Sequence, residues 1–183
     1  MNDPDHDRAA SVYDHPAARD PARLEAECEI GFSRRSGPGG QNRNKVETAV
    51  VFTHLPTGLK SSASERRTQG ENRRMALFRL RLELALVIRR PIVIGEEGGY
   101  RPSVLWCSRR KGGRMEVNPA HDDYPALLAE ALDVLAVCED EPRLASPILG
   151  CSPTQLVKLL KAVPRGLIVL NASREQGGKG PLR

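Results

Sequence analysis

One glycine-rich segment holds the residues best suited to chemistry. It runs Ser36-Gly-Pro-Gly-Gly-Gln41, and this density of glycine and proline excludes a helix or a strand. Consecutive glycines permit a close backbone approach to a ligand, and N–H groups presented in this way stabilise a developing oxyanion. The segment has neither the P-loop nor the dinucleotide-binding pattern, and no serine, cysteine or histidine occupies an obvious nucleophile motif. Its chemistry would therefore consist of positioning water and a reacting carbonyl; the alternative is an ordinary surface turn.

Positive charge is concentrated around this segment. Residues 33–90 contain 13 Lys and Arg but only 4 Asp and Glu, whereas the whole 183-residue chain contains 28 and 23. Lysine and arginine at this density favour a polyphosphate partner such as nucleic acid, and a solvated basic surface is the alternative. The candidate RNA-binding residues flank the glycines or follow the next hairpin: Arg34, Arg35, Arg43, Lys45, Arg67, Arg73 and Arg74.

The cysteines and the apolar runs bear on cofactors and on location. The four cysteines are too far apart in sequence for a CxxC pair, so we expect neither a zinc site nor a redox motif. Scattered thiols are typical of a reducing cytosol. The first residues include aspartates and no apolar run, which is unlike a signal or transit peptide. The longest apolar run, residues 84–88, is too short to span a bilayer. We therefore expect a cytoplasmic protein without a metal, a cofactor or a membrane contact.

The first half of the chain predicts a small α+β domain over residues 23–91. Residues 1–22 lack periodicity and are expected to be a disordered tail. Alternation predicts a strand over residues 24–32, and the glycine segment then leads to a short helical turn at residues 44–48. The later elements are a hairpin of residues 49–55 and 59–63, and a long helix over residues 72–90 that stops at Pro91. The antiparallel strands should pack on this helix, with the glycine segment protruding.

The second half predicts a small all-α module over residues 119–176. Expected helices begin at Pro125 and Pro153, and Gly150 should end the short helix between them. The sequence pattern of residues 145–160 is similar to a helix-turn-helix, but a helical bundle for packing or protein contact is favoured over a DNA-binding motif. Residues 92–118 are expected to be a linker with a basic arm, whose Trp106 either stacks on RNA or packs on the domain. Residues 177–183 are expected to be a flexible tail.

Three motifs together resemble the catalytic domain of the class I bacterial and organellar peptide chain release factors. They are Ser36-Gly-Pro-Gly-Gly-Gln-Asn-Arg-Asn-Lys45, Val51-Phe-Thr-His-Leu-Pro-Thr-Gly58 and Arg67-Thr-Gln-Gly-Glu-Asn-Arg73. All three occur in the family's order and at similar spacing, and the resemblance covers about residues 24–90. It implies that this domain promotes hydrolysis of the ester between a nascent peptide and tRNA. The implied partners are the large ribosomal subunit, its 23S-type rRNA and peptidyl-tRNA.

The resemblance also implies roles for single residues. Gly39, Gly40 and Gln41 would form the tip that enters the peptidyl transferase centre. The Gln41 backbone N–H would stabilise the transition state or the leaving 3′ oxygen, and its side chain would orient water. Gln41 would also be the candidate for side-chain N-methylation by a glutamine methyltransferase. Asn42 and Arg43 stand where the family commonly has His and Val, which would alter how the tip docks.

Departures from the family bear on how the protein is directed to ribosomes. About 23 residues precede the first expected strand, which leaves no room there for a codon reader. The chain is therefore similar to the short, codon-independent rescue factors that act on stalled ribosomes, and we expect a monomer. Those factors usually end in a basic tail, whereas a near-neutral helical module follows here. Two alternatives stay open: a non-catalytic ribosome- or rRNA-binding regulatory protein, and a DNA-binding regulator centred on residues 142–174.

Overall fold

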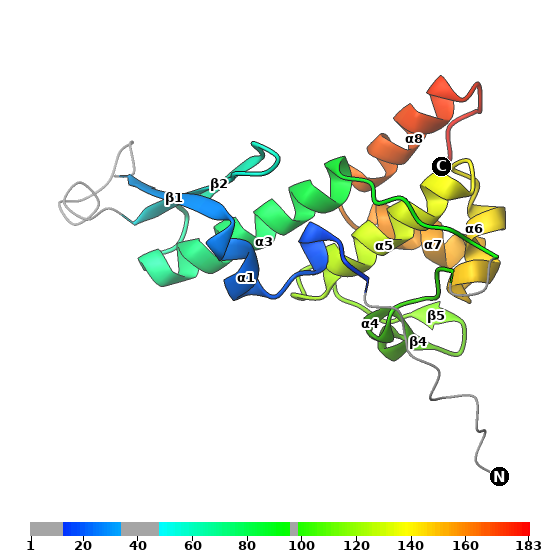
Figure 1. Cartoon of the computed structure of the whole chain (residues 1–183), viewed down its shortest axis with the longest axis horizontal. Coiled ribbons are helices and arrows are strands. Elements are labelled where there is room, and N and C mark those ends of the chain that lie inside the picture. The colour runs from blue at the N-terminus through cyan, green and yellow to red at the C-terminus, as the bar shows by residue number, and fades with distance from the viewer. Residues whose placement is uncertain (1–12, 34–47, 96–98) are drawn as a thin grey trace, which may run out of the picture.

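The computed structural model describes residues 13–33, 48–95 and 99–183 as strands at one end of an elongated molecule and helices at the other (Figure 1). Helix α3 connects the two ends, and the arrangement confirms the predicted α+β class. The elements are η2 (Pro16–Ala18), α1 (Pro21–Ala26), β1 (Cys28–Ser33), β2 (Ala49–His54), β3 (Lys60–Ala63), α3 (Gln69–Val87), α4 (Val104–Arg109), β4 (Arg110–Lys111), β5 (Arg114–Met115), α5 (Tyr124–Val137), α6 (Pro142–Leu149), α7 (Pro153–Lys161) and α8 (Gly166–Gln176).

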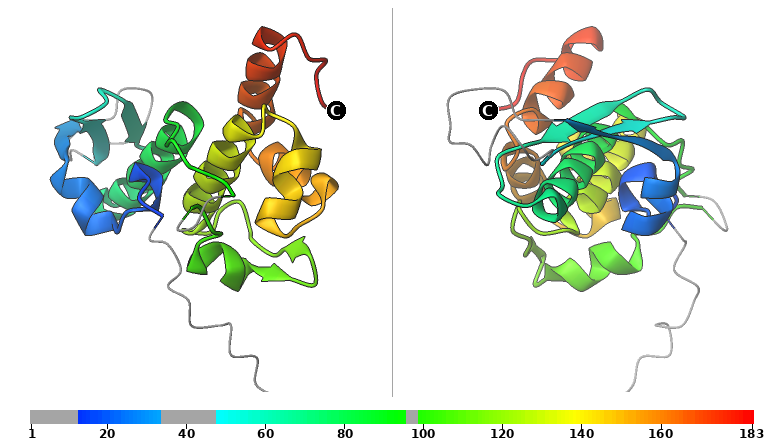
Figure 2. Two further views of the ribbon diagram at one scale, coloured as in Figure 1. Left: turned by 45° about the vertical axis from the view of Figure 1, so that its right-hand side comes forward. Right: turned by 90° about the vertical axis from the view of Figure 1, so that its left-hand side faces the viewer.

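The three strands β1, β2 and β3 form an antiparallel sheet in that order. The predicted hairpin is confirmed, because β2 and β3 pair with Val50 opposite Ala63. Gly58 in the connecting turn has φ of 70°, a left-handed conformation that glycine adopts without a steric penalty. The right-hand view in Figure 2 shows α3 lying against one face of the sheet. Val50 and Phe52 are fully buried and belong to the same core cluster as the side chains of α3. Burying these side chains between sheet and helix stabilises the hairpin.

Helix α3 is the element that both ends of the molecule share. The side chain of Thr68 accepts from Glu71 N at 3.2 Å, and Glu71 bonds back to Thr68, so a capping box starts the helix. Its side chains contact both the sheet and α5. Leu80 and Leu84 belong to one buried cluster that extends from the sheet into the C-terminal helices. The two regions predicted as separate domains therefore share a continuous core.

The C-terminal helices begin and end where the sequence predicts. Gly150 has φ of 63° and ends α6, and Ser152 caps α7 by accepting from Gln155 N at 3.2 Å. Helix α5 is buried on several sides, because α3, α6, α7 and η2 all pack against it. Even its carboxylates Glu130 and Asp133 are buried. No helix in the described residues is long and apolar enough to cross a membrane.

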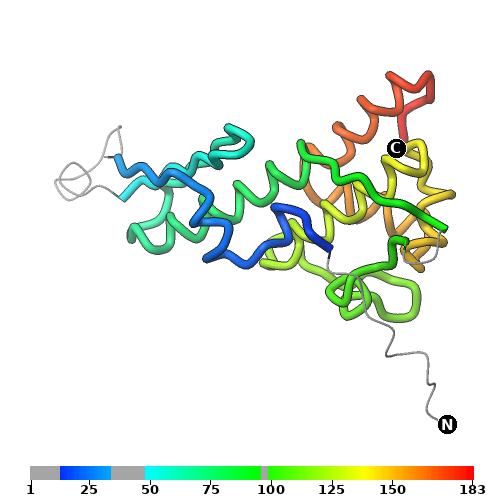
Figure 3. The backbone as a smooth tube through the Cα atoms, viewed as in Figure 1, coloured from blue at the N-terminus to red at the C-terminus, as the bar shows by residue number. Residues whose placement is uncertain are grey.

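The segment before β1 is ordered, which corrects the prediction of a tail over residues 1–22 for its described part. Tyr13 donates a hydrogen bond to Asp133 of α5 at 2.6 Å, and His15 and Ala17 are fully buried. Figure 3 shows this segment running beside α3 before it turns into the sheet. The strand predicted over residues 24–32 begins only at Cys28, because Asp20 caps the preceding turn and starts α1. The segment is ordered by contacts with elements that are distant in sequence. Sequence periodicity does not predict such contacts.

The described part of residues 92–118 also packs on the helices, which corrects the prediction of a linker. Trp106 is fully buried in α4 and donates from Nε1 to Leu149 O at 2.8 Å, so it cannot stack on RNA. Tyr100 and the backbone and side chain of Ser103 donate to Glu130, at 2.7, 2.7 and 2.6 Å. These bonds satisfy a carboxylate whose burial would otherwise be costly. Residues 110–115 form a two-stranded hairpin with basic residues in its strands and two glycines in its turn.

The last residues are held to α8 and were not expected to be. Leu182 exchanges two hydrogen bonds with the side chain of Asn171, at 2.8 and 3.1 Å. Arg174 donates to Gly180 O at 3.0 Å. The prediction of a flexible tail over residues 177–183 is therefore wrong, because paired polar groups fix the backbone there.

Candidate functional site

The ends of β1 and β2 determine where the glycine-rich segment leaves and rejoins the fold. Ser33 pairs with Ala49 in the last position of the β1–β2 ladder. The chain between them therefore departs from and returns to adjacent points at one end of the sheet. That end points away from the C-terminal helices (Figure 1). Residues 44–47 of the predicted helical turn lie outside the described residues. So do these predicted site residues: Gly39, Gly40, Gln41, Arg34, Arg35, Arg43 and Lys45.

A buried asparagine fixes the return point of this segment. Asn72, in the first turn of α3, is fully buried. Its Nδ2 donates to Thr48 O at 2.7 Å and to Arg66 O at 3.1 Å, and its Oδ1 accepts from Arg66 N at 2.9 Å. All three bonds go to backbone groups, so the amide joins three stretches of chain: the approach to β2, the approach to α3, and α3 itself. Asn72 thereby fixes the point at which the chain rejoins the sheet after the glycine-rich segment.

Asn72 belongs to one of the three sequence motifs, but no role was predicted for it from the sequence. Two signals could have identified it. Asn72 precedes Ala76 and Leu80 at intervals of four residues, which places it on the buried face of α3. An amide on a buried face must find hydrogen-bond partners, and the backbone of a nearby loop is the usual source.

Three arginines after the hairpin were predicted to bind RNA, and their contacts in the structure differ. Arg73 donates from Nε to both carboxylate oxygens of Glu25 at 3.2 Å, and its guanidinium lies 6.0 Å from the centre of the Phe52 ring. The hydrogen bonds that Arg73 donates to Glu25 raise the pKa of Arg73. By contrast, Arg67 and Arg74 are exposed, and neither guanidinium forms a hydrogen bond or ion pair with a described residue. The Arg73 side chain thus holds α1 against α3, and its predicted contact with RNA stays a prediction.

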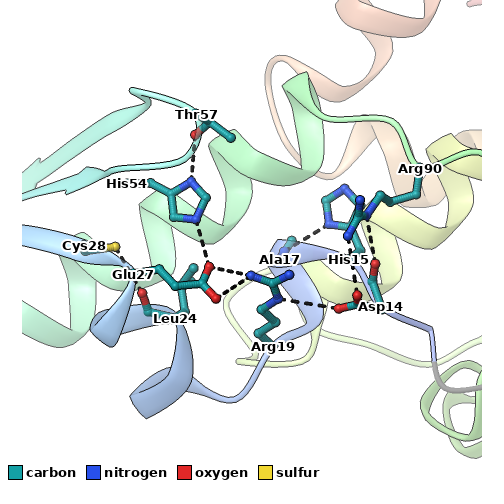
Figure 4. A network of polar contacts seen from close by, with 10 residues as sticks. All are labelled: Asp14, His15, Ala17, Arg19, Leu24, Glu27, Cys28, His54, Thr57 and Arg90. Atoms are coloured by element: carbon teal, nitrogen blue, oxygen red, sulfur yellow. Dashed lines mark hydrogen bonds and ion pairs between the residues drawn. The ribbon is translucent and has the colours of Figure 1, made fainter.

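The opposite end of the sheet is held by a polar network (Figure 4). His54 is almost fully buried, with Nδ1 2.7 Å from Thr57 Oγ1 in the hairpin turn and Nε2 3.3 Å from Glu27 Oε2. Glu27 also accepts from Arg19 at 2.6 Å. Burial alone would raise the pKa of Glu27, but hydrogen bonds from His54 and Arg19 outweigh it and lower the pKa. The hairpin is therefore anchored to α1 and the N-terminal segment through the buried His54.

Comparison with known proteins agrees with this geometry. Residues 23–91 match the RF-1 domain family. Among curated proteins, the chain is 48% identical over 63 residues to "Peptide chain release factor PrfB1, chloroplastic" of Arabidopsis thaliana, covering 34% of this chain and 14% of that protein. It is 44% identical over 82 residues to "Peptide chain release factor 1" of Chloroherpeton thalassium, covering 43% and 23%. It is 54% identical over 59 residues to the protein of that name in Streptococcus thermophilus, covering 32% and 16%.

The sheet and the long capped helix define a domain in which the chain between β1 and β2 leaves and rejoins the sheet at one end. Residues 23–91 form an RF-1 domain, similar to the corresponding part of the peptide chain release factors. The match to each of these relatives spans less than a quarter of that relative's length.

Proposed function

We propose that this protein hydrolyses the peptidyl-tRNA ester on the ribosome without reading a codon, and so releases peptides from stalled ribosomes. The observation that carries the proposal is the place of Gly39-Gly40-Gln41 in an RF-1 domain, between the paired strand ends Ser33 and Ala49. The relatives are named peptide chain release factors, which supports a role in translation release.

The proposed chemistry needs only positioned backbone and side-chain groups. Gly39 and Gly40 let the Gln41 backbone N–H approach the ester in the peptidyl transferase centre and donate to the developing negative charge. The Gln41 side chain orients the attacking water. Water adds to the ester carbonyl, the bond to the tRNA 3′ oxygen breaks, and that oxygen takes up a proton. No covalent enzyme intermediate is required. Separately, the Gln41 side-chain amide is the proposed target of a glutamine methyltransferase.

Two of the proposed RNA contacts use arginines that form no hydrogen bond or ion pair with a described residue. Arg67 lies just before α3 and Arg74 lies in its second turn, and both are exposed, so their charges are available to phosphates of 23S-type rRNA. Arg34, Arg35, Arg43 and Lys45 flank the glycines in sequence and would extend the same contact into the large subunit. Arg73 would contribute indirectly, because its bond to Glu25 stabilises the domain.

The surroundings of the RF-1 domain support the codon-independent part of the proposal. Before the domain, Tyr13, His15 and Ala17 pack against α3 and α5 or bond to them. After it, the helices from α4 onward contribute to the same buried cluster. In the described part of the chain, both regions are thus used for packing around α3 and α5.

The test measures release of labelled peptide from ribosome complexes whose A site holds no codon, a sense codon or a stop codon. The proposal predicts ribosome-dependent release in all three complexes. Release confined to stop codons would overturn codon independence but would still support hydrolysis of the peptidyl-tRNA ester. Ribosome binding without release in any complex would favour the non-catalytic ribosome- or rRNA-binding alternative.

A further inference from the structure

A groove at the end of the molecule opposite the sheet is the strongest candidate for a second site. Its volume is about 450 Å³, within the range of about 300–1,000 Å³ common for ligand pockets, and it lies between α6, α7 and the last residues of the chain. Its apolar lining comes from Pro142, Pro153, Val157 and Leu182, which are buried or half-buried. Because Asn171 holds the backbone of Leu182 at 2.8 and 3.1 Å, this wall is part of the fold.

One face of α7 supplies much of the groove. Thr154, Val157, Lys158 and Lys161 follow one another at intervals of three, one and three residues, which places them on one side of the helix. The other side carries Leu156, Leu159 and Leu160, which are buried in the core. Substitutions on the groove face can therefore change its chemistry without emptying the core.

The charges around the groove are positive and unpaired. Arg143, Lys158 and Lys161 are exposed, and none of the three forms an ion pair with a described residue. Glu141 is the one acidic side chain among the lining residues. It lies 3.0 Å from Arg174 and 3.7 Å from Lys179, so its charge is already compensated. A ligand in the groove thus meets an apolar lining beside several free cations.

We propose that this groove binds a segment of a partner protein in which aliphatic side chains lie beside Asp or Glu carboxylates. The aliphatic groups would be buried against Val157 and Leu182, and the carboxylates would pair with Lys158, Lys161 and Arg143. Nucleic acid fits this site less well, because its lining contains no aromatic ring on which a base could stack. The binding site is independent of the hydrolysis proposed for the other end of the molecule.

The test selects short random peptides displayed on phage against the full-length protein. Selected peptides are then measured by fluorescence anisotropy, together with a single-stranded RNA of matched charge. The proposal predicts that selected peptides combine net negative charge with aliphatic residues. Their affinity should fall at least about tenfold in Val157→Asp and in Lys158→Glu/Lys161→Glu, as expected when central interface residues are lost. Higher salt should also weaken binding, because exposed charges are screened.

Arg114→Glu is the matched control, because Arg114 is an exposed cation in β5, away from the groove lining. It should leave peptide affinity unchanged, and thermal unfolding should confirm that all variants fold. The proposal is overturned if the selected peptides are not acidic, or if the groove variants bind them as the wild type does. It is also overturned if only the RNA binds and the groove variants lose that binding.

Discussion

The side chain of Asn72 donates to the backbone carbonyl of Thr48 at 2.7 Å, which ties the first turn of α3 to the start of β2. The residues before Thr48 lead back to the glycine-rich segment, and Ser33 opposite Ala49 closes the other side. One buried amide therefore connects α3 to the point at which the chain rejoins the sheet. Its role is to fix this point, which follows the segment proposed to carry the chemistry.

Replacing Asn72 should impair both stability and release. Asn72→Ala leaves the carbonyl of Thr48 and the backbone of Arg66 without their partners, which costs about 1–3 kcal/mol of unfolding free energy. Peptide release should fall even under conditions in which the variant is fully folded. Denaturant unfolding and single-turnover release check the two effects.

The control for Asn72 is Glu83→Ala, which removes an exposed ion pair with Arg165 from the same helix. Such surface pairs contribute about 0–1 kcal/mol, and release should be unchanged. If folded Asn72→Ala released peptide at the wild-type rate, the positioning role would be wrong.

The unpaired arginines of α3 should matter more for ribosome binding than the paired ones. Arg74→Ala removes an exposed cation without a described partner, whereas Arg79→Ala removes one that bonds to Glu65 at 2.5 Å. If Arg74 contacts a phosphate, its loss should weaken ribosome binding and lower the salt dependence by about one charge. Binding titrations at several salt concentrations measure this, and equal losses in both variants would argue against a specific phosphate contact.

Acidification should loosen the N-terminal segment through His15. Ala17 N donates to His15 Nδ1 at 3.0 Å, so the ring is neutral and Nε2 carries the proton toward Ile88 O. Burial lowers the pKa of His15 from 6.5 to about 4, and the nearby Arg89, Arg90 and Arg19 act in the same direction. Between these values the unfolded chain binds more protons than the folded one. This stabilising contribution is therefore complete above pH 6.5 and is lost as the pH falls, by up to about 1.4 kcal/mol per pH unit.

The matched variant for this effect is His15→Asn, whose side-chain oxygen can still accept from Ala17 N but does not titrate. The unfolding free energy of the wild type, minus that of the variant, should decrease from pH 7 to pH 4.5. A difference that does not change with pH would show that His15 is not the responsible group.

The shared core predicts that the chain unfolds as one unit. Leu80 and Leu84 of α3 lie in the same buried cluster as Leu128 of α5, so separating the two regions would expose both faces. Calorimetry should show one transition with equal calorimetric and van't Hoff enthalpies. Two resolved transitions would mean that residues 23–91 and the C-terminal helices fold independently.

Elements with strong local signals could be predicted from the sequence. The hairpin follows from the β-branched residues of β2 and the turn signal Pro56-Thr57-Gly58, and α7 follows from Ser152 and Pro153 at its start. The place of the glycine-rich segment between two strands was also predictable, because both neighbours alternate or carry β-branched residues.

Features that depend on distant contacts could not be predicted in this way. Tyr13 is ordered by Asp133, 120 residues later, and Trp106 is buried by its bond to Leu149. Neither partner is visible in a local pattern. The bond between Arg73 and Glu25 could not be predicted for the same reason, since an arginine in a basic region gives no sign of a distant carboxylate partner.

The central claim is tested most directly by peptide release from ribosomes without a codon in the A site, with Gly40→Ala against the wild type. Alanine at this position restricts the backbone that presents the Gln41 N–H, and losing one such donor costs about 10²–10³ in rate. Gly70→Ala is the control, because Gly70 lies in the exposed first turn of α3 with open space around it. The account predicts that Gly40→Ala loses release but still binds ribosomes, while Gly70→Ala behaves as the wild type. Release by Gly40→Ala at the wild-type rate would contradict it.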